Sequence, residues 1–456
     1  PPVLCVLDGD RSPSHHQHQR HHPPPPAAPP PPPPPPRPSP PPPSPHASPY
    51  RRFPPPSPSP PPASYPYQPW TFYTARNFVS SIKNFNVSLY ARDLDRRFRA
   101  PIWRNHYEAD NPLNIEPLRQ RSDNYFLVLG DWGKSIQYVD GSRIKGRGEC
   151  QWEVFQKINA YVKSQAARGK RLLFVANVGD SFYWSGVKPS TNESWRKQWA
   201  ERYGVLDKNS ALHGVPFLSV MGNHDYGNTD KWAACPHRRP RAVVGGQGYA
   251  STQFNSDKNP EKPEFARHYW LPDYNYHYSI PELDLELIAV DQNMNGMESN
   301  YPWGIGGSAK GHEESFHACG GWEEVRDFLF KVGKSGEELL VDRARHSAAS
   351  TVVIINHYLT QGARLKLLFE AAQRELQPSQ MPAKVLSAYG HVHGQACHGR
   401  NVEGECDVIL SGGGGGCCKD DLKDPGFTAI HLRDNGGFVT NVDGIDVRIA
   451  RGNCSW

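Results

Sequence analysis

The sequence predicts an α/β fold, and three observations lead to that class. Short apolar runs recur from residue 125 onward, and such runs are typical of strands that are buried on both faces. Stretches with apolar residues at helical spacing separate several of these runs. Five of the runs are followed by a glycine or another small residue and then by Asp, Asn or His. Open α/β sheets carry their chemistry at such strand ends, so the fold class also predicts where the functional site lies.

The five strand ends carry side chains of the types that bind hard metal ions. Asp180 and Tyr183 leave one of these strands, and a carboxylate there can bridge two cations while a phenol three residues on reaches only one. A single Gly-Asp pair after a strand is more typical of a turn, so the prediction depends on the recurrence. In chain order, the runs 126–129, 172–175, 217–221, 352–355 and 385–389 precede the motifs GDWG (130–133), GDSFY (179–183), GNHD (222–225), NHY (356–358) and GHVH (390–393).

The other elements follow from residue spacing. Trp152, Phe155, Ile158 and Val162 recur at helical spacing ahead of Gly169, which predicts a helix between two of the strands. Helices are also predicted over 194–203, 321–346 and 365–376, and further strands over 285–290 and 407–410.

The strand at 407–410 leads into Ser411 and a run of five glycines, Gly412 to Gly416. A glycine run permits close backbone approach to a group in the site, and it is equally typical of a floppy loop. Both interpretations stay open at this point.

The N-terminal part has a different composition. Most of the 46 prolines precede residue 70, and such a tract predicts a polyproline II spacer or a disordered leader. We therefore divide the chain into a Pro/His-rich leader (1–63), a basic and aromatic lead-in (64–122) and one α/β domain (123–456). The chain opens with Pro1 rather than methionine, which favours a fragment, so a signal peptide is not excluded.

Charge and hydropathy limit the classes of partner that the chain is expected to bind. The net charge of +5 is mildly basic, and no zinc finger, recognition helix or aromatic RNA platform accompanies it, so we expect no nucleic-acid partner. No apolar run approaches the ~20 residues that a membrane-spanning helix needs.

Nine cysteines lack the paired spacings of a structural zinc site. One or two disulfides in an oxidising compartment fit them, with free thiols in the cytosol as the alternative. Three sequons, at Asn86, Asn192 and Asn453, also favour a secreted, extracellular or vacuolar-lysosomal location. The cysteines that lie closest together are Cys397, Cys406, Cys417 and Cys418.

The strand-end residues form the inventory of a two-metal phosphoryl-transfer site. Two cations about 3.5–4 Å apart stabilise an in-line displacement in which a metal-bound hydroxide attacks phosphorus. Such a site uses a bridging carboxylate, oxygen ligands on the harder ion, and amide and imidazole ligands on the softer one. His224, beside a ligating Asn, is the candidate general acid for the leaving alkoxide. The candidate metal ligands are Asp131, Asp180, Tyr183, Asn223, His357, His391 and His393.

The five motifs in this order resemble the calcineurin-like metallophosphoesterases, and among them the small, tartrate-resistant type of purple acid phosphatase. The resemblance covers about 123–444 and implies an αββα sandwich, two mixed sheets flanked by helices. It also implies that Asp131, Tyr183 and His393 bind Fe(III), and that Asp180 bridges. Asn223, His357 and His391 would then bind a divalent Fe, Zn or Mn. The expected activity is hydrolysis of phosphomonoesters in acid, with resistance to tartrate.

The subfamily also has a physical argument. Most of the superfamily has a ligating histidine where this chain has Gly133, and here Tyr183 takes its place. A phenol with a free pKa near 10 ionises in acid only against a strongly polarising cation, which favours Fe(III). Fe(III) also lowers the pKa of bound water, which supplies hydroxide in acid.

Three positions depart from the family pattern, and we expect them to affect the substrate more than the metals. Ser181 and Gly394 stand where Asn is usual, and Asn356 stands where Gly is usual. The segment after Tyr358 also looks shorter than the family's loop at the mouth of the site.

Two other functions stay open. A phosphodiesterase or protein phosphatase with two divalent ions would share nearly all these ligands, and only Tyr183 with Gly133 argues against it. The tract 39–45 resembles extensin-type sequence, and this resemblance suggests a second alternative, a non-catalytic wall-associated binding protein. Such a tract also tethers enzymes to a wall or matrix.

Overall fold

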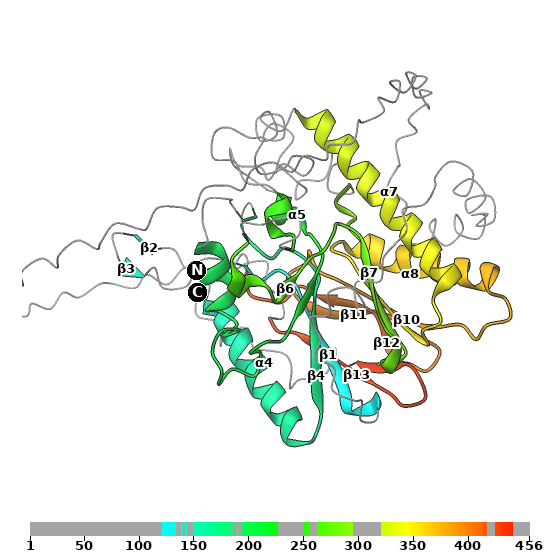
Figure 1. The fold of residues 1–456 in the computed structure, drawn as a ribbon, viewed down its shortest axis with the longest axis horizontal. Helices are drawn as coiled ribbons and strands as arrows, with labels where there is room; N and C mark the ends of the chain where they lie inside the picture. The colour runs from blue at the N-terminus through cyan, green and yellow to red at the C-terminus, as the bar shows by residue number, and fades with distance from the viewer. Residues whose placement is uncertain are drawn as a thin grey trace, which may run out of the picture. The chain divides into compact units, whose positions relative to one another are not determined.

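The computed structural model describes residues 121–133, 138–139, 142–143, 149–183, 186–187, 193–226, 250–255, 262–294, 321–416 and 425–440. The predicted leader, nearly all of the lead-in and the three sequon asparagines lie outside these ranges. The described residues form two mixed six-stranded sheets with flanking helices (Figure 1), which confirms the predicted α/β sandwich.

The first sheet has the strand order β14-β13-β1-β4-β5-β6. Its central strands β1, β4 and β5 run parallel, and β13 and β14 continue it in antiparallel fashion. Its strands are β1 (Asn124–Leu129), β4 (Arg171–Asn177), β5 (Phe217–Ser219), β6 (Tyr269–Trp270), β13 (Thr428–Leu432) and β14 (Phe438–Thr440).

The second sheet has the order β11-β12-β10-β9-β8-β7. Strands β8, β9, β10 and β12 are parallel, and the edge strands β7 and β11 are antiparallel. Its strands are β7 (Tyr276–Ile280), β8 (Leu285–Ala289), β9 (Thr351–Ile355), β10 (Lys384–Tyr389), β11 (Gln395–Arg400) and β12 (Cys406–Ser411). A separate two-stranded ribbon pairs β2 (Tyr138–Val139) with β3 (Ser142–Arg143).

The apolar strands are buried on both faces, as continuous apolar runs predict. In β9, Val353 and Ile355 pack in the core between the sheets. Val352 and Ile354 belong to a second cluster, which the sheet forms with the helices outside it. Alternate side chains of one strand therefore hold together three layers of the sandwich.

Helices cover the outer faces. Figure 1 shows α4 alongside β4, and α7 and α8 beside the sheet that contains β10 and β12. Helix α7 carries Glu323 and Glu324 in its first turn and Arg343, Arg345 and His346 in its last, the charge order that the helix dipole favours. The predicted helix at 194–203 is a shorter π-helical segment. The helical elements are α4 (Glu149–Ala167), η2 (Trp195–Ala200), α5 (Asn223–Tyr226), α7 (Trp322–His346) and α8 (Leu359–Leu376).

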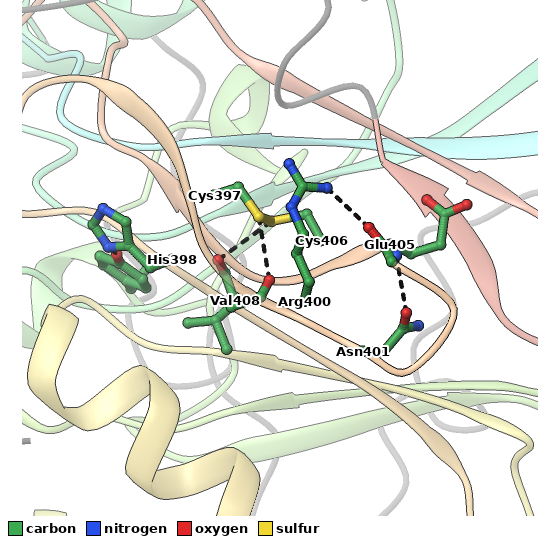
Figure 2. Close-up of a disulfide and its surroundings, with 10 residues drawn as sticks. Cys397, His398, Arg400, Asn401, Glu405, Cys406 and Val408 are labelled. Atoms are coloured by element: carbon green, nitrogen blue, oxygen red, sulfur yellow. Dashed lines mark hydrogen bonds between the residues drawn. A yellow bond between two sulfur atoms is a disulfide. The ribbon is translucent and has the colours of Figure 1, made fainter. Parts of the chain in front are cut away.

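A disulfide joins Cys397 to Cys406 across the β11–β12 hairpin (Figure 2), two of the cysteines that lie close in the sequence. Cys150 is also disulfide-bonded. None of the helices in the described ranges combines the length and apolar character that crossing a bilayer requires.

Candidate metal centre

The predicted site residues follow five strand ends that belong to two different sheets. Asp131, Asp180 and Asn223 follow β1, β4 and β5 of the first sheet. His357 and His391 follow β9 and β10 of the second. Each half of the candidate site is thus carried by adjacent parallel strands, and the two halves meet where the sheets face each other.

The backbone is strained at three of these residues. Asp131, Asp180 and His391 have φ values of 57°, 52° and 68°, and Asp284 is the one other non-glycine residue of the described ranges with positive φ. Left-handed backbone costs about 1–2 kcal/mol for most residues and persists where the surrounding structure holds it. The strain therefore marks a place where the fold fixes side-chain direction at a cost in stability.

The Tyr183 hydroxyl lies at the centre of one group of side chains. Its oxygen is 3.1 Å from Asp131 Oδ1, 3.1 Å from Asp180 Oδ2 and 3.2 Å from His393 Nε2. Tyr183 is 5% exposed, and both carboxylates are 1% exposed. Four ligand-type groups from three strand ends thus converge on one small volume.

A second group forms around Asn223. The side-chain oxygen of Asn223 lies 2.9 Å from His357 Nε2 and 2.9 Å from His391 Nδ1. Asp180 Oδ2 is 3.3 Å from His357 Nε2. One ligand atom each from Asp180, His357 and His391 lies within 4.8 Å of the others. Asp180 therefore belongs to both groups, and the structure brings all seven predicted ligands together.

His224 lies beside these groups. Its backbone N–H donates to Asp180 Oδ1 at 2.8 Å, and its Nε2 is 4.0 Å from Asp180 Oδ2. The imidazole packs on the Tyr183 ring, with the ring centroids 4.3 Å apart. The side chain reaches the candidate site, and its backbone helps to orient the shared carboxylate.

Polar contacts behind the site orient its side chains. His357 Nδ1 lies 2.9 Å from the Val178 carbonyl, which only accepts, so Nδ1 carries the proton and Nε2 faces Asn223. The backbone N–H of His391 donates to Asp131 Oδ2 at 2.9 Å. These two contacts also connect loops of the two sheets.

The five glycines are not a floppy loop. Gly412 to Gly416 are buried, and the N–H groups of Gly414 and Gly416 donate to the carbonyls of Gly130 and Asp131. A Cβ on Gly412 would lie 2.8 Å from Asp131 Oδ2. The backbone of the glycine run thus approaches closely the loop that carries the candidate ligand Asp131.

Two of the departures from the family pattern do not contact the site directly. Ser181 is fully buried, and its hydroxyl accepts from Asn177 at 2.8 Å and from Tyr269 at 2.9 Å. Asn356 is fully buried, and its side-chain oxygen accepts the Tyr358 N–H. Both side chains lie in the core, and their expected effect on the substrate stays a prediction.

Sequence reasoning missed two buried carboxylates near the site. Asp225 ends the GNHD motif, yet no role was assigned to it. Asp291 follows the apolar run 285–290, the same signal that identified the other strand ends. It accepts from the Tyr226 hydroxyl at 2.5 Å, and Asn293 connects it to the Met221 carbonyl. Asp291 therefore fastens α5 to the end of β8.

The electrostatics of the site call for a cation. Burial, followed by Asp131 and Asp180, raises the pKa of Tyr183 well above its usual value. Burial and then Asp180 raise the pKa of Asp225 to about 7. Burial also acts to raise the pKa of Asp180, but His357 and His224 outweigh it, and the pKa is lowered. Buried acids and a phenol packed this closely gain stability when positive charge is placed between them.

The donor set fits metal ions. Two carboxylates, a phenol, an amide oxygen and three imidazoles combine the oxygen donors preferred by hard ions with the nitrogen donors preferred by softer ones. Within the described ranges, the ion-pair partners of Asp131 and Asp180 are histidines, with no Lys or Arg. The site therefore has ligands of the types that metal ions bind.

The fold and the site define a metal-dependent phosphoesterase. Residues 125–395 match the family model of the calcineurin-like phosphoesterases (Metallophos), and the chain belongs to this family. The predicted calcineurin-like fold is thereby confirmed.

Comparison with curated proteins gives no significant match. Among solved structures, the chain is similar to one described as GAP50, the anchor in the inner membrane complex of Plasmodium. That likeness has 16% identity and a TM-score of 0.39, and it covers 69% of this chain and 82% of the other. A structure of PhoD has 11% identity and a TM-score of 0.34, covering 71% of this chain and 66% of the other. Both likenesses are too distant to indicate a substrate or a partner.

Proposed function

We propose that this metal-dependent phosphoesterase is a dinuclear acid phosphatase of the purple type that hydrolyses phosphomonoesters. The observation that carries the proposal is the position of the Tyr183 hydroxyl, within 3.2 Å of Asp131, Asp180 and His393. If the Tyr183 hydroxyl pointed into the core, away from the carboxylates, the remaining ligands would fit any two-metal phosphoesterase equally well.

The ligand roles follow from the two groups of side chains. Asp131, Tyr183 and His393 would hold Fe(III), and Asp180 would bridge. A phenol whose pKa is raised by burial and by two carboxylates loses its proton only to a strongly polarising ion, which supports Fe(III) there. The remaining ligands, which would hold a divalent Fe, Zn or Mn ion, are Asn223, His357 and His391.

The side chains around the metals have separate tasks. When bound, the metal pair would polarise the phosphoryl group of the substrate and activate a water at acidic pH. His224, which is 6% exposed at the edge of the ligand groups, is placed to protonate the leaving oxygen. The Val178 carbonyl keeps the proton of His357 on Nδ1, which leaves Nε2 free to bind.

The same proposal covers location and partners. A disulfide between Cys397 and Cys406 is typical of an oxidising compartment, which supports a secreted or vacuolar-lysosomal enzyme. The Pro-rich leader would then serve as a tether to a wall or matrix.

Metal analysis and a visible spectrum on the same sample test the proposal. We expect about one iron per chain and a phenolate-to-iron band, and Tyr183→Phe should remove the band. Tyr125→Phe is the matched control, because this buried tyrosine hydroxyl has no hydrogen-bond partner in the described part of the chain. A colourless protein that contains only zinc or manganese would instead favour the phosphodiesterase or protein phosphatase with two divalent ions.

The substrate class is tested separately. The protein should hydrolyse p-nitrophenyl phosphate in mild acid much faster than bis(p-nitrophenyl) phosphate. The reverse preference would refute the monoesterase assignment while leaving the metal assignment standing.

A further inference from the structure

Asp225 is a buried carboxylate that the proposed mechanism does not use. It is fully buried in α5, two residues after the candidate ligand Asn223. Its oxygens do not point into either ligand group. They face the backbone of two loops instead, so the residue has a task other than binding metal or substrate.

The hydrogen bonds of Asp225 join the loop after β4 to the loop after β5. Its Oδ1 accepts the N–H of Phe182 at 3.2 Å, and its Oδ2 accepts the N–H of Gly222 at 2.8 Å. The Ser181 N–H lies 3.2 and 3.3 Å from the two oxygens, and the Gln253 amide donates to Oδ1 at 3.0 Å. One carboxylate thus accepts from three backbone N–H groups and one side-chain amide.

Two of these N–H groups belong to the residues that follow Asp180. Asp180 has left-handed backbone, with φ 52°, and it follows Gly179, with φ 95°. A strained residue keeps its conformation only where its neighbours are fixed. By holding Ser181 and Phe182, Asp225 fixes the chain immediately after the strained aspartate and so sets the direction of its carboxylate.

The four-residue helix α5 contributes three consecutive groups to this arrangement. Asn223 places its amide oxygen between His357 and His391. The backbone N–H of His224 holds Asp180 Oδ1, and the carboxylate of Asp225 holds the N–H groups after Asp180. The shared aspartate is therefore held from both sides by one short turn.

We infer that Asp225 is a positioning residue for the metal centre, which locks the shared carboxylate of Asp180 in register with Asn223. This inference rests on the proposed two-metal site. Charge-assisted hydrogen bonds that backbone N–H groups donate to a carboxylate are stronger than neutral ones, and removing the acceptor leaves buried donors unpaired. Residues behind metal ligands commonly change metal affinity by about 10–100-fold when they are replaced.

The test is Zn²⁺ affinity of the full-length chain. The protein is stripped of metal and titrated with Zn²⁺ in competition with a chromophoric chelator, at a temperature where circular dichroism shows each variant to be folded. Asp225→Asn keeps the shape but turns an N–H₂ toward the backbone donors, so Zn²⁺ should bind about 10–100-fold more weakly. Asp225→Glu keeps the charge but lengthens the side chain, and it should show a loss of similar size.

Glu286→Gln is the matched control. Glu286 is another buried acid, 1% exposed, whose side chain binds Arg343 at 2.7 Å and also Ser279 and Ser347, none of which is a candidate ligand. Its replacement should lower the unfolding temperature and leave Zn²⁺ affinity unchanged. This contrast separates positioning of the ligands from a general loss of stability.

The outcomes distinguish the two proposals. Wild-type protein that fails to bind two Zn²⁺ ions overturns the two-metal function itself. Wild type that binds two ions, with Asp225→Asn or Asp225→Glu matching it, overturns the positioning role alone. If Asp225→Asn does not fold, Gln253→Met removes one donor to Asp225 while the Tyr269 hydroxyl keeps Ser181 as a partner. That variant should weaken Zn²⁺ binding several-fold, and wild-type affinity in it would also overturn the inference.

Discussion

At the scale of single residues, chemistry and strain coincide. Asp131, Asp180 and His391 have left-handed backbone, and each is a candidate ligand. The backbone N–H of His391 holds Asp131, and that of His224 holds Asp180. Part of the stability of the fold is thus given up to aim these side chains.

Replacing His224 with Ala separates its side chain from its backbone. The backbone N–H that holds Asp180 survives the change, so the bound metal should be retained. Loss of a general acid lowers turnover by about 10²–10⁴-fold. The loss should be largest with an alkyl phosphate and smaller with p-nitrophenyl phosphate, whose leaving group needs less protonation. Steady-state kinetics with metal analysis check this, and a variant that loses its metals contradicts the acid role.

His431 predicts part of the pH dependence of stability. It stacks on Tyr125, and its Nε2 lies 2.7 Å from the Tyr161 hydroxyl. Burial, and then Lys170, lower its pKa below the usual value of 6.5. The unfolded chain therefore binds a proton first as pH falls, so this contribution to stability is present above pH 6.5 and is lost as pH falls through the lower folded pKa. Unfolding temperatures from pH 7.5 to 4.5 should fall less steeply in His431→Gln, and parallel curves would refute this.

At the scale of elements, backbone packing brings the loops together. The strand β12 enters the glycine run, whose N–H groups hold the loop that contains Asp131. The Ser411 hydroxyl adds a hydrogen bond to the Val128 carbonyl at 2.8 Å. A strand of the second sheet thereby fixes a ligand loop of the first.

Gly412→Ala should disturb the ligand without unfolding the chain. Its Cβ would lie 2.4 Å from the Val392 carbonyl oxygen and 2.8 Å from Asp131 Oδ2, so Asp131 must shift. Overpacking of this kind costs about 1–3 kcal/mol. We expect roughly tenfold weaker metal binding, the size of effect seen for residues behind ligands. Gly404→Ala is the control: no atom lies within 4 Å of its added Cβ, although Gly404, unlike Gly412, has positive φ, so this variant carries backbone strain without any contact with a ligand. Equal metal affinity in both variants would contradict the prediction.

At the scale of the whole molecule, the candidate site exists only where the two sheets face each other. The Tyr183 group contains residues of β1, β4 and β10 loops, and His357 reaches the Val178 carbonyl of the other sheet. The core between the sheets, which includes Leu127 and Ile355, therefore sets the separation of the two ligand groups.

The disulfide contributes to the stability of the whole domain and not to its chemistry. Cys397 and Cys406 are nine positions apart, and closing a loop of this length is worth about 2–3 kcal/mol on the chain-entropy model. The double replacement by Ser should therefore lower the unfolding temperature by a few degrees. Metal content should not change, because neither cysteine contacts a ligand. An unchanged unfolding temperature would show that the hairpin gains nothing from the bond.

The parallel strands were predictable because their two buried faces require continuous apolar runs. The edge strands were not. The sequence of β11 is QACHGR, and its burial alternates irregularly, so it has no apolar period to detect. Such a strand forms because β12 offers it hydrogen-bond partners, a tertiary effect. Helix α8 likewise begins at Leu359, six residues before the start predicted from spacing at Leu365.

The sequence by itself determined the α/β class, the apolar strands and the chemical types of the seven candidate ligands, because strand burial and strand-end position are local properties of the chain. Tertiary structure alone decided that Tyr183 points toward Asp131 and Asp180, that Ser181 points into the core, and that Asp225 joins two loops. These depend on side-chain direction and on how two sheets pack, and no spacing within one strand specifies either.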